Sequence, residues 1–171
     1  MKLSSLRSVI ESLNRAGVRY LVAGGMAVVA HGYGRVTFDL DLVIKLERDN
    51  ILNAFAALDK LGYRPRVPVR AQDFADESVR RQWIRDKGMA VLTLYSEEHS
   101  RTPIDIFAEE PFEFDPTYEA SVKEEIAPGV PFCFVDIPAL IQMKQKTGRD
   151  KDRDDVAHLK MILKQMAERG A

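Results

Sequence analysis

Residues 18–44 read VRYLVAGGMAVVAHGYGRVTFDLDLVI, and this stretch decides the fold class. A short β-prone run leads into the pair Gly24-Gly25. The apolar residues 26–30 then predict a short helix that ends at the next glycines. Residues 37–44 predict a second strand. The glycine pair is thus followed by one helix and a return strand, which directs attention to the charged side chains of that strand.

Two aspartates alternate with apolar residues in this second strand. Aspartate is depleted in strands, yet Asp39 and Asp41 stand between Phe38, Leu40 and Leu42. A period of two puts both carboxylates on one face, with Cβ atoms about 7 Å apart. A divalent cation would offset their repulsion and favour the ionised forms. A solvent-facing polar edge is the alternative, but the apolar run beside the aspartates is typical of a buried strand.

A third acid stands alone in a later apolar run, Pro103-Ile104-Asp105-Ile106-Phe107. A single buried charge is costly unless it is paired or bound to a metal. If this strand pairs beside the strand that carries Asp39 and Asp41, the three carboxylates converge. The pattern therefore predicts a divalent-metal site for phosphate chemistry.

The glycine pair would supply the complementary half of such a site. A strand, glycines and a helix start leave unpaired backbone N–H groups pointing outward. Such groups bind phosphate, and glycine lets the phosphate come close. A plain tight turn would also explain Gly24 and Gly25. Their place before Asp39, with room for one helix and a return strand, favours the phosphate-binding interpretation.

The remaining sequence predicts an α+β protein with a mixed sheet flanked by helices. Its 171 residues suggest one domain, in which we distinguish a core of residues 1–135 from a C-terminal helical extension of residues 136–171. Apolar spacing predicts two helices in the extension, about 137–147 and 152–168, which would form a helical hairpin packed on the core. Residues 112–135 predict only short strands and turns.

Composition narrows the class of protein further. The formal net charge of −1 gives no support for a large nonspecific nucleic-acid footprint. The single cysteine, Cys133, excludes an intrachain disulfide framework. No apolar run approaches the roughly 20 residues of a membrane helix, and the charged N-terminus lacks the apolar region of a signal peptide. We therefore expect a cytoplasmic protein without a membrane partner.

The combination of glycines and acids resembles the nucleotidyltransferase superfamily, the fold of polymerase-β-like enzymes. Its signature is a hydrophobic residue before Gly-Gly or Gly-Ser, a short helix, Asp-x-Asp and a third acid on a later strand. Ala23-Gly24-Gly25, Asp39-Leu40-Asp41 and Asp105 match these positions, and the resemblance covers about residues 18–108. Gly25 stands where the signature often has serine, which removes a hydroxyl but keeps the backbone donors.

The residues between the glycines and the aspartates are similar to a small stand-alone bacterial branch of that superfamily, often associated with toxin–antitoxin systems. They are His31-Gly32, Arg35 and Thr37. The resemblance implies that Arg35 and Thr37 belong with Gly24 and Gly25 to the nucleotide- and phosphate-binding set. The role of His31 stays open between a group that orients Asp41 or touches the nucleotide and a structural residue.

The C-terminal part has a second, weaker similarity, to the tail of AbiEii-type nucleotidyltransferase toxins. There a helical lysine and a later aspartate belong to the functional set. Lys144 matches the lysine, and Asp152 or Asp155 matches the aspartate. Lys144 would meet a nucleotide phosphate as a point charge. A solvated charge run that caps the last helix is the alternative.

The resemblance implies Mg²⁺-dependent transfer of an NMP from an NTP, such as ATP, to a hydroxyl acceptor. Asp39 and Asp41 would hold two Mg²⁺ ions, with Mn²⁺ as an alternative. Asp105 would share the second ion or act as general base. The acceptor would be an RNA end, a protein hydroxyl or a small molecule, and a toxin–antitoxin partner protein would fit the branch.

Two other functions compete with this expectation. Some chains with this fold serve as catalytically inactive binding modules, either toxin–antitoxin partners or regulators, but retention of all three acids favours an enzyme. A metal-dependent phosphoesterase would use water as acceptor, and the sequence shows no additional His/Asp metal cluster for it.

Overall fold

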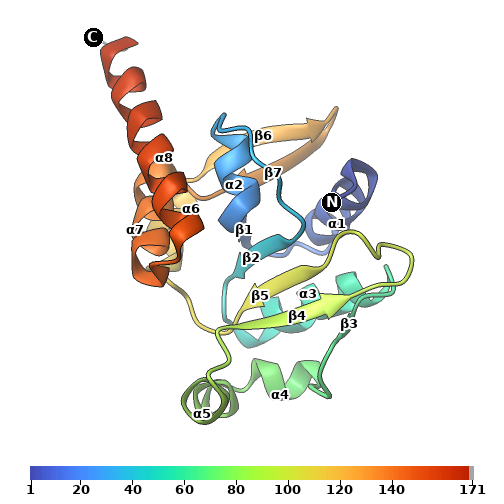
Figure 1. Ribbon diagram of the computed structural model, residues 1–171. Helices are drawn as coiled ribbons and strands as arrows, with labels where there is room; N and C mark the ends of the chain where they lie inside the picture. Colours follow the sequence, from blue (N-terminus) through green and yellow to red (C-terminus); the bar gives the residue numbers. More distant parts are fainter. Residues whose placement is uncertain (170–171) are drawn as a thin grey trace.

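The computed structural model describes residues 1–169 (Figure 1). In chain order its elements are α1 (Leu3–Arg15), β1 (Tyr20–Val22), α2 (Gly24–Ala30), β2 (Leu40–Ile44), α3 (Arg48–Asp59), β3 (Arg64–Pro65), α4 (Ala71–Ala75), α5 (Glu77–Lys87), β4 (Val91–Tyr95), β5 (Ile104–Phe107), α6 (Phe114–Glu119), β6 (Val122–Ala127), β7 (Val130–Phe134), α7 (Ile137–Thr147) and α8 (Asp150–Arg169). None of the helices within residues 1–169 has both the length and the apolar character to cross a bilayer.

The strands form one seven-stranded mixed sheet in the order β3-β4-β5-β2-β1-β7-β6. β2 runs parallel to β5 and β1 runs parallel to β7, while the other neighbours are antiparallel. Helices flank this sheet (Figure 1), so the expected α+β class with a mixed sheet is confirmed. The interior strand β1 is buried along its whole length, because both of its faces are covered.

Helix α1 shows how the apolar pattern places a helix on this sheet. Leu6, Val9, Ile10 and Leu13 recur at helical spacing, and each is at most 2% exposed. This face packs against α3 and β7. The amphipathic pattern of the sequence therefore fixes which side of α1 meets the core.

The C-terminal helices α7 and α8 form the expected hairpin, and α7 also contacts α2. Helix α7 begins after Asp136, whose carboxylate accepts a hydrogen bond of 2.9 Å from the Ala139 amide. Pro138 is tolerated in the first turn because its missing N–H would have no helical partner there. Helix α7 ends before Gly148, which adopts a left-handed conformation with φ of 64°.

The buried face of α8 is polar near its start and apolar at only one position. Its sequence spacing favours an apolar face, yet only Leu159 is buried among the apolar residues, and Leu163 and Met166 are 41% and 59% exposed. Asp152 and Asp155 are buried instead. Figure 1 shows the reason, since the second half of α8 projects beyond the rest of the protein and has no surface to pack on.

Helix α6 was not expected, because the sequence of residues 112–135 predicts only strands and turns. Its six residues are too few to show a helical period. Long-range contacts hold it in place: Asp115 accepts ion-pair hydrogen bonds from Arg19 at 2.7 Å and Lys45 at 2.8 Å. Phe114 is buried beneath these pairs.

Candidate active site

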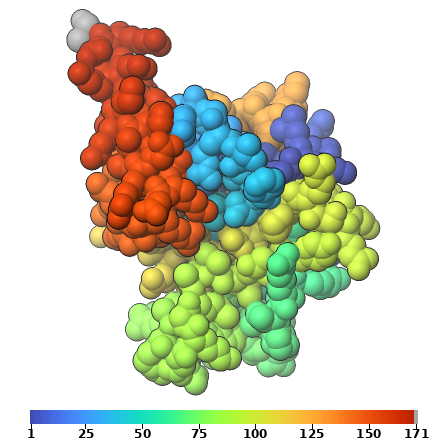
Figure 2. Space-filling view, viewed as in Figure 1, coloured from blue at the N-terminus to red at the C-terminus, as the bar shows by residue number. Residues whose placement is uncertain are grey.

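A cleft of about 510 Å³ lies between the central strands and the α7–α8 hairpin. Figure 2 shows this hairpin beside the segment that follows α2. Of the eight residues that the sequence singles out for a site, only Thr37 is absent from the lining of the cleft. The lining includes Gly24, Gly25, Arg35, Asp39, Asp41, Asp105 and Lys144.

Two of the expected acids come together through strand pairing. Asp41 and Asp105 are register partners on the parallel neighbours β2 and β5. Residues in register on adjacent strands point to the same face of the sheet. Leu40 and Leu42 point to the opposite face and are fully buried. The alternation in sequence therefore delivers Asp41 and Asp105 side by side to the cleft.

Asp39 enters the same cleft from outside the sheet. The sequence predicts a strand from residue 37, but β2 begins only at Leu40, so this boundary was wrong. The Thr37 hydroxyl donates to Asp39 Oδ1 at 3.1 Å, a local bond that competes with strand pairing. The ladder starts where the Leu40 amide reaches the Pro103 carbonyl at 2.9 Å. We refer to Asp39, Asp41 and Asp105 as the three cleft aspartates.

A threonine that the sequence analysis missed supports the third cleft aspartate. Thr93 on β4 is the antiparallel partner of Asp105. Its hydroxyl donates to Asp105 Oδ1 at 2.6 Å. The signal available in the sequence is weak, since a threonine in a strand of the pattern VLTLY is ordinary. The pairing of β4 with β5 identifies Thr93, and that pairing is not encoded locally.

The surroundings of Asp41 disfavour the ionised form of its carboxyl group. Burial raises its pKa from 3.8 to about 6, and the nearby charges of Asp39 and Asp105 act in the same direction. The Gly25 amide and the Lys144 ammonium act in the opposite direction. Because like charges gather here without full solvation, the cleft favours binding either a proton or a cation.

Side chains of the protein itself lie close against the glycine pair. Gly24 has a positive φ of 57°, and a Cβ added to it would lie 1.8 Å from Asp41 Oδ2. A Cβ on Gly25 would lie 2.6 Å from Thr37 Oγ1 and 2.9 Å from Arg35 Nη2. Only glycine fits at residue 24, since a side chain there would occupy the space of the Asp41 carboxylate. Helix α2 starts at Gly24, two residues earlier than the sequence predicts.

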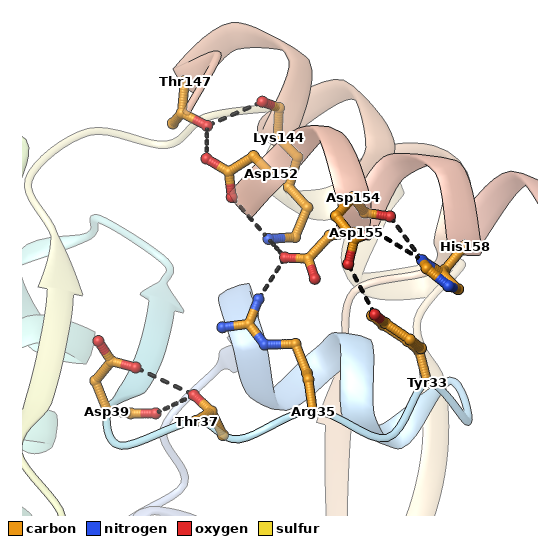
Figure 3. A network of polar contacts seen from close by, with 10 residues as sticks. All are labelled: Tyr33, Arg35, Thr37, Asp39, Lys144, Thr147, Asp152, Asp154, Asp155 and His158. Carbon is orange, nitrogen blue, oxygen red and sulfur yellow. Dashed lines mark hydrogen bonds and ion pairs between the residues drawn. The ribbon is translucent and has the colours of Figure 1, made fainter. Parts of the chain in front are cut away.

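A polar network joins the α7–α8 hairpin to the segment before β2 (Figure 3). Lys144 is only 7% exposed, and its ammonium donates to Asp152 Oδ1 at 3.0 Å and to Asp155 Oδ2 at 2.6 Å. Arg35 Nη1 donates to the same Asp155 oxygen. Both candidate aspartates of α8 are therefore bound to Lys144, which answers the alternative of a solvated charge run.

Tyr33 and His158 extend this network and also hold the segment before β2 against α8. The Tyr33 hydroxyl donates to Asp154 Oδ2 at 2.7 Å, and its ring stacks on His158 with centroids 3.8 Å apart. Val36 and Phe38 are 72% and 70% exposed, so apolar packing gives this segment little support. Contacts with α8 thus hold the segment that leads to Asp39.

His31 has a structural environment. Its Nε2 lies 2.7 Å from the Val135 carbonyl oxygen, and its ring meets Phe134 edge-on with centroids 5.0 Å apart. Val135 and Phe134 are buried at the end of β7. These contacts fix the end of α2 against the sheet, and His31 is not among the residues that line the cleft.

The cleft offers a donor set suited to a hard cation but not a finished metal cage. Across residues 1–169, no three His, Cys, Asp or Glu side chains converge closely enough to hold an ion by themselves. Mg²⁺ is usually bound by one or two carboxylates together with substrate phosphates and water, because it gives up water reluctantly. The three cleft aspartates, all oxygen ligands, fit this mode of binding.

Comparison with known proteins adds information about the fold. No family model and no curated protein matches the chain. Among solved structures, it is similar to the crystal structure of ANT(2'')-Ia, an aminoglycoside nucleotidyltransferase, in complex with adenylyl-2''-tobramycin. The TM-score is 0.57 at 12% sequence identity, over 99% of this chain and 98% of the other.

The chain has a nucleotidyltransferase-like fold. The similarity extends over nearly the whole length of both proteins, so it includes the sheet and the C-terminal helices. At this low identity the similarity shows the fold alone, and any chemistry depends on the residues of the cleft.

Proposed function

We propose that this protein is a metal-dependent nucleotidyltransferase that moves an NMP from an NTP to a hydroxyl acceptor. The observation that carries the proposal is the pairing of Asp41 with Asp105 across β2 and β5, with Asp39 at the entrance of β2. The glycine pair at the start of α2 lies directly behind Asp41. Acids for a metal and the glycine pair at the start of a helix thus meet in one cleft.

The metal would be held by Asp39 and Asp41, with Asp105 in reach of the same ions. We propose two Mg²⁺ ions, with Mn²⁺ as a substitute, because the ligands are hard carboxylate oxygens. When bound, the ions neutralise phosphate charge and lower the pKa of an acceptor hydroxyl. They would also relieve the repulsion that raises the pKa of Asp41.

Asp105 is the candidate general base. The Thr93 hydroxyl engages its Oδ1 at 2.6 Å, which fixes the carboxylate and leaves Oδ2 to accept the proton of the acceptor hydroxyl. The transfer breaks the bond between the α- and β-phosphates and releases pyrophosphate. The acceptor oxygen forms the new bond to the α-phosphate.

Arg35 is the best-placed side chain for a phosphate at the glycine pair. Its Nη1 is held by Asp155, while its Nη2 lies against Gly25. The backbone of Gly24 and Gly25 would supply further donors. Thr37 acts through Asp39, to which its hydroxyl donates. Lys144 contributes positive potential, since two of its three N–H donors are already bound to Asp152 and Asp155.

The acceptor belongs to one of three classes, an RNA end, a protein hydroxyl or a small molecule. The printed complex of ANT(2'')-Ia contains adenylylated tobramycin, which gives the small-molecule class a structural precedent. A toxin–antitoxin partner and an AbiEii-type origin rest on the sequence resemblance. The competing function, an inactive binding module or regulator, is disfavoured because all three acids line the cleft.

The test is a transfer assay with each α-labelled NTP and Mg²⁺ or Mn²⁺, alone and with total RNA, cell protein or a small-molecule extract. Wild-type protein is expected to move label onto one acceptor class, and Asp39→Ala is expected to abolish the transfer. Absence of transfer, together with calorimetry that detects no Mg²⁺-dependent NTP binding, would overturn the enzyme proposal and leave a binding module.

A further inference from the structure

The wall of the cleft that the α7–α8 hairpin forms is rich in cations. Lys144, Lys146, Arg149 and Lys151 all line it. Lys144 already forms ion pairs with two buried carboxylates, Asp152 and Asp155. Lys146 Nζ reaches the Pro111 carbonyl oxygen at 3.0 Å on the segment after β5. The two remaining cations lie where the two helices join, within residues 147–151, a segment that takes in the end of α7 and the start of α8 and that we call the α7–α8 turn.

Arg149 and Lys151 are exposed and take no part in the buried ion pairs of Lys144. Within residues 1–169, neither forms an ion pair or a side-chain hydrogen bond. Arg153, on the next turn of α8, differs in both respects, since it pairs with Asp150 at 3.4 Å and does not line the cleft. The free charges of this helical end are therefore the ones that face the cleft.

The backbone of the α7–α8 turn, which carries these two cations, is anchored by hydrogen bonds. The Thr147 hydroxyl contacts the Lys144 carbonyl oxygen at 2.9 Å and Asp152 Oδ2 at 2.7 Å. The Gly148 amide donates to the same carbonyl at 3.2 Å. Asp152 in turn holds Lys144, so the turn is anchored to the buried network on both sides. A preorganised turn loses little conformational entropy when it binds a ligand.

Acidic and basic residues reach the cleft from different elements, the acids mainly from the strands and the segments beside them and the cations mainly from the α7–α8 hairpin. Arg35 and Lys144 are balanced by the buried Asp152 and Asp155. Among the residues 1–169 that line the cleft, the groups without an ion pair are the three cleft aspartates with Glu109 and Glu110, and the cations Lys146, Arg149 and Lys151 of the hairpin. A matching ligand has a metal-bound end near the strands and a strongly anionic end near the turn.

We propose that Arg149 and Lys151 bind the β- and γ-phosphates of the NTP and, after transfer, the pyrophosphate product. This assignment rests on the proposed nucleotidyl transfer and deepens it. Arg149 offers a planar fork of donors suited to a phosphate, and Lys151 offers a compact charge. The buried Lys144 then serves as the fixed centre that positions the turn.

The experiment compares the dissociation constants of ATP and AMP in Mg²⁺, or of the NTP and NMP that the wild-type protein prefers. The proteins are the wild type, Arg149→Ala/Lys151→Ala, and Arg153→Ala as a matched control that also lies on α8. We expect the double variant to lose about tenfold or more in NTP affinity, because two charged contacts to phosphate are removed. NMP affinity should change less than about twofold, the scale of a screened surface charge.

Pyrophosphate gives an independent reading of the same contacts. Its affinity should fall in the double variant in parallel with that of the NTP, and Arg153→Ala should leave all three affinities unchanged. Unfolding curves of the variants check that the fold is kept, which their exposure makes the expected result.

Three outcomes would count against the assignment. Unchanged NTP affinity in the double variant would overturn it while leaving the proposed function intact. Equal losses for NTP and NMP would also overturn it, because the cations would then act as a general electrostatic field. Failure of the wild-type protein to bind any NTP would overturn the proposed function itself, and the assignment with it.

Discussion

Replacing Asp41 with asparagine is expected to stabilise the metal-free protein at neutral pH. In the folded protein, burial and two neighbouring aspartates raise the pKa of Asp41 from 3.8 to about 6. Asparagine has the same shape, can still accept from the Gly25 amide and carries no charge. The substitution removes the cost of keeping this carboxylate ionised in the cleft.

The size of the effect follows from the pKa shift. A shift of about two units at about 1.4 kcal/mol per unit gives a gain of about 2 to 3 kcal/mol in the free energy of unfolding. The sign follows because the folded protein holds the proton of Asp41 more tightly than the unfolded chain. The contribution of Asp41 to stability is therefore greatest below about pH 4 and is lost as pH rises through about 6. Above that range, Asp41→Asn should show its full advantage.

The assay is urea unfolding of the wild type and Asp41→Asn at pH 4, 6 and 8 in the presence of a chelator. The two proteins should be equally stable at pH 4 and differ most at pH 8. Asp115→Asn serves as a control of opposite sign, because hydrogen bonds from Lys45 and Arg19 lower the pKa of Asp115. Loss of the Asp115 charge should lower the free energy of unfolding at pH 8. Millimolar Mg²⁺ should raise the stability of the wild type more than that of Asp41→Asn.

Either of two results would refute this reasoning. If Asp41→Asn is less stable than the wild type at pH 8, the carboxylate makes favourable contacts that outweigh its burial and repulsion. If it is more stable by the same amount at pH 4 and pH 8, the gain does not come from ionisation. Either result would remove the electrostatic argument for a cation in the cleft.

Two further substitutions at the cleft, Gly24→Ala and Lys144→Met, test its geometry, with Gly17→Ala as a control away from it. Gly24→Ala and Gly17→Ala both place a side chain at positive φ, at 57° and 65°. This should cost Gly17→Ala about 1 to 2 kcal/mol in urea unfolding, and Gly24→Ala should cost more, because its Cβ would also lie 1.8 Å from Asp41 Oδ2. Only Gly24→Ala should also displace Asp41 and reduce Mg²⁺-dependent NTP binding, since a Cβ on Gly17 meets nothing within 4 Å; equal binding by both variants would contradict this. Lys144→Met should cost about 3 to 5 kcal/mol, because it leaves two buried carboxylates without a cation. A loss below about 1 kcal/mol, measured the same way, would show that this network adds nothing to stability.

Local patterns in the sequence were enough to predict several parts of the molecule. The span of α7, its cap at Asp136 and the end at Gly148 all follow from short-range chemistry. The alternation around Asp41 and Asp105 predicts which face of each strand is polar. These features depend on residues within a few positions of one another, so the chain encodes them directly.

Other features were decided by tertiary structure. Thr93 supports Asp105 because β4 pairs with β5, and α6 forms around ion pairs between residues far apart in the chain. The boundary of β2 at Leu40 depends on where its neighbour begins. No local period carries this information, since the partner of each group is chosen by packing.

The charged residues around the start of α8 show most clearly which features the sequence determines and which the tertiary structure decides. By sequence alone, Lys144, Asp152 and Asp155 fit a solvated surface as well as a site. The fold buries them together and adds Arg35 from a segment 120 positions away from Asp155. The sequence determines which charges exist and how they are spaced on each helix. Only tertiary structure decides which of them lose water, because burial depends on elements that meet from distant parts of the chain.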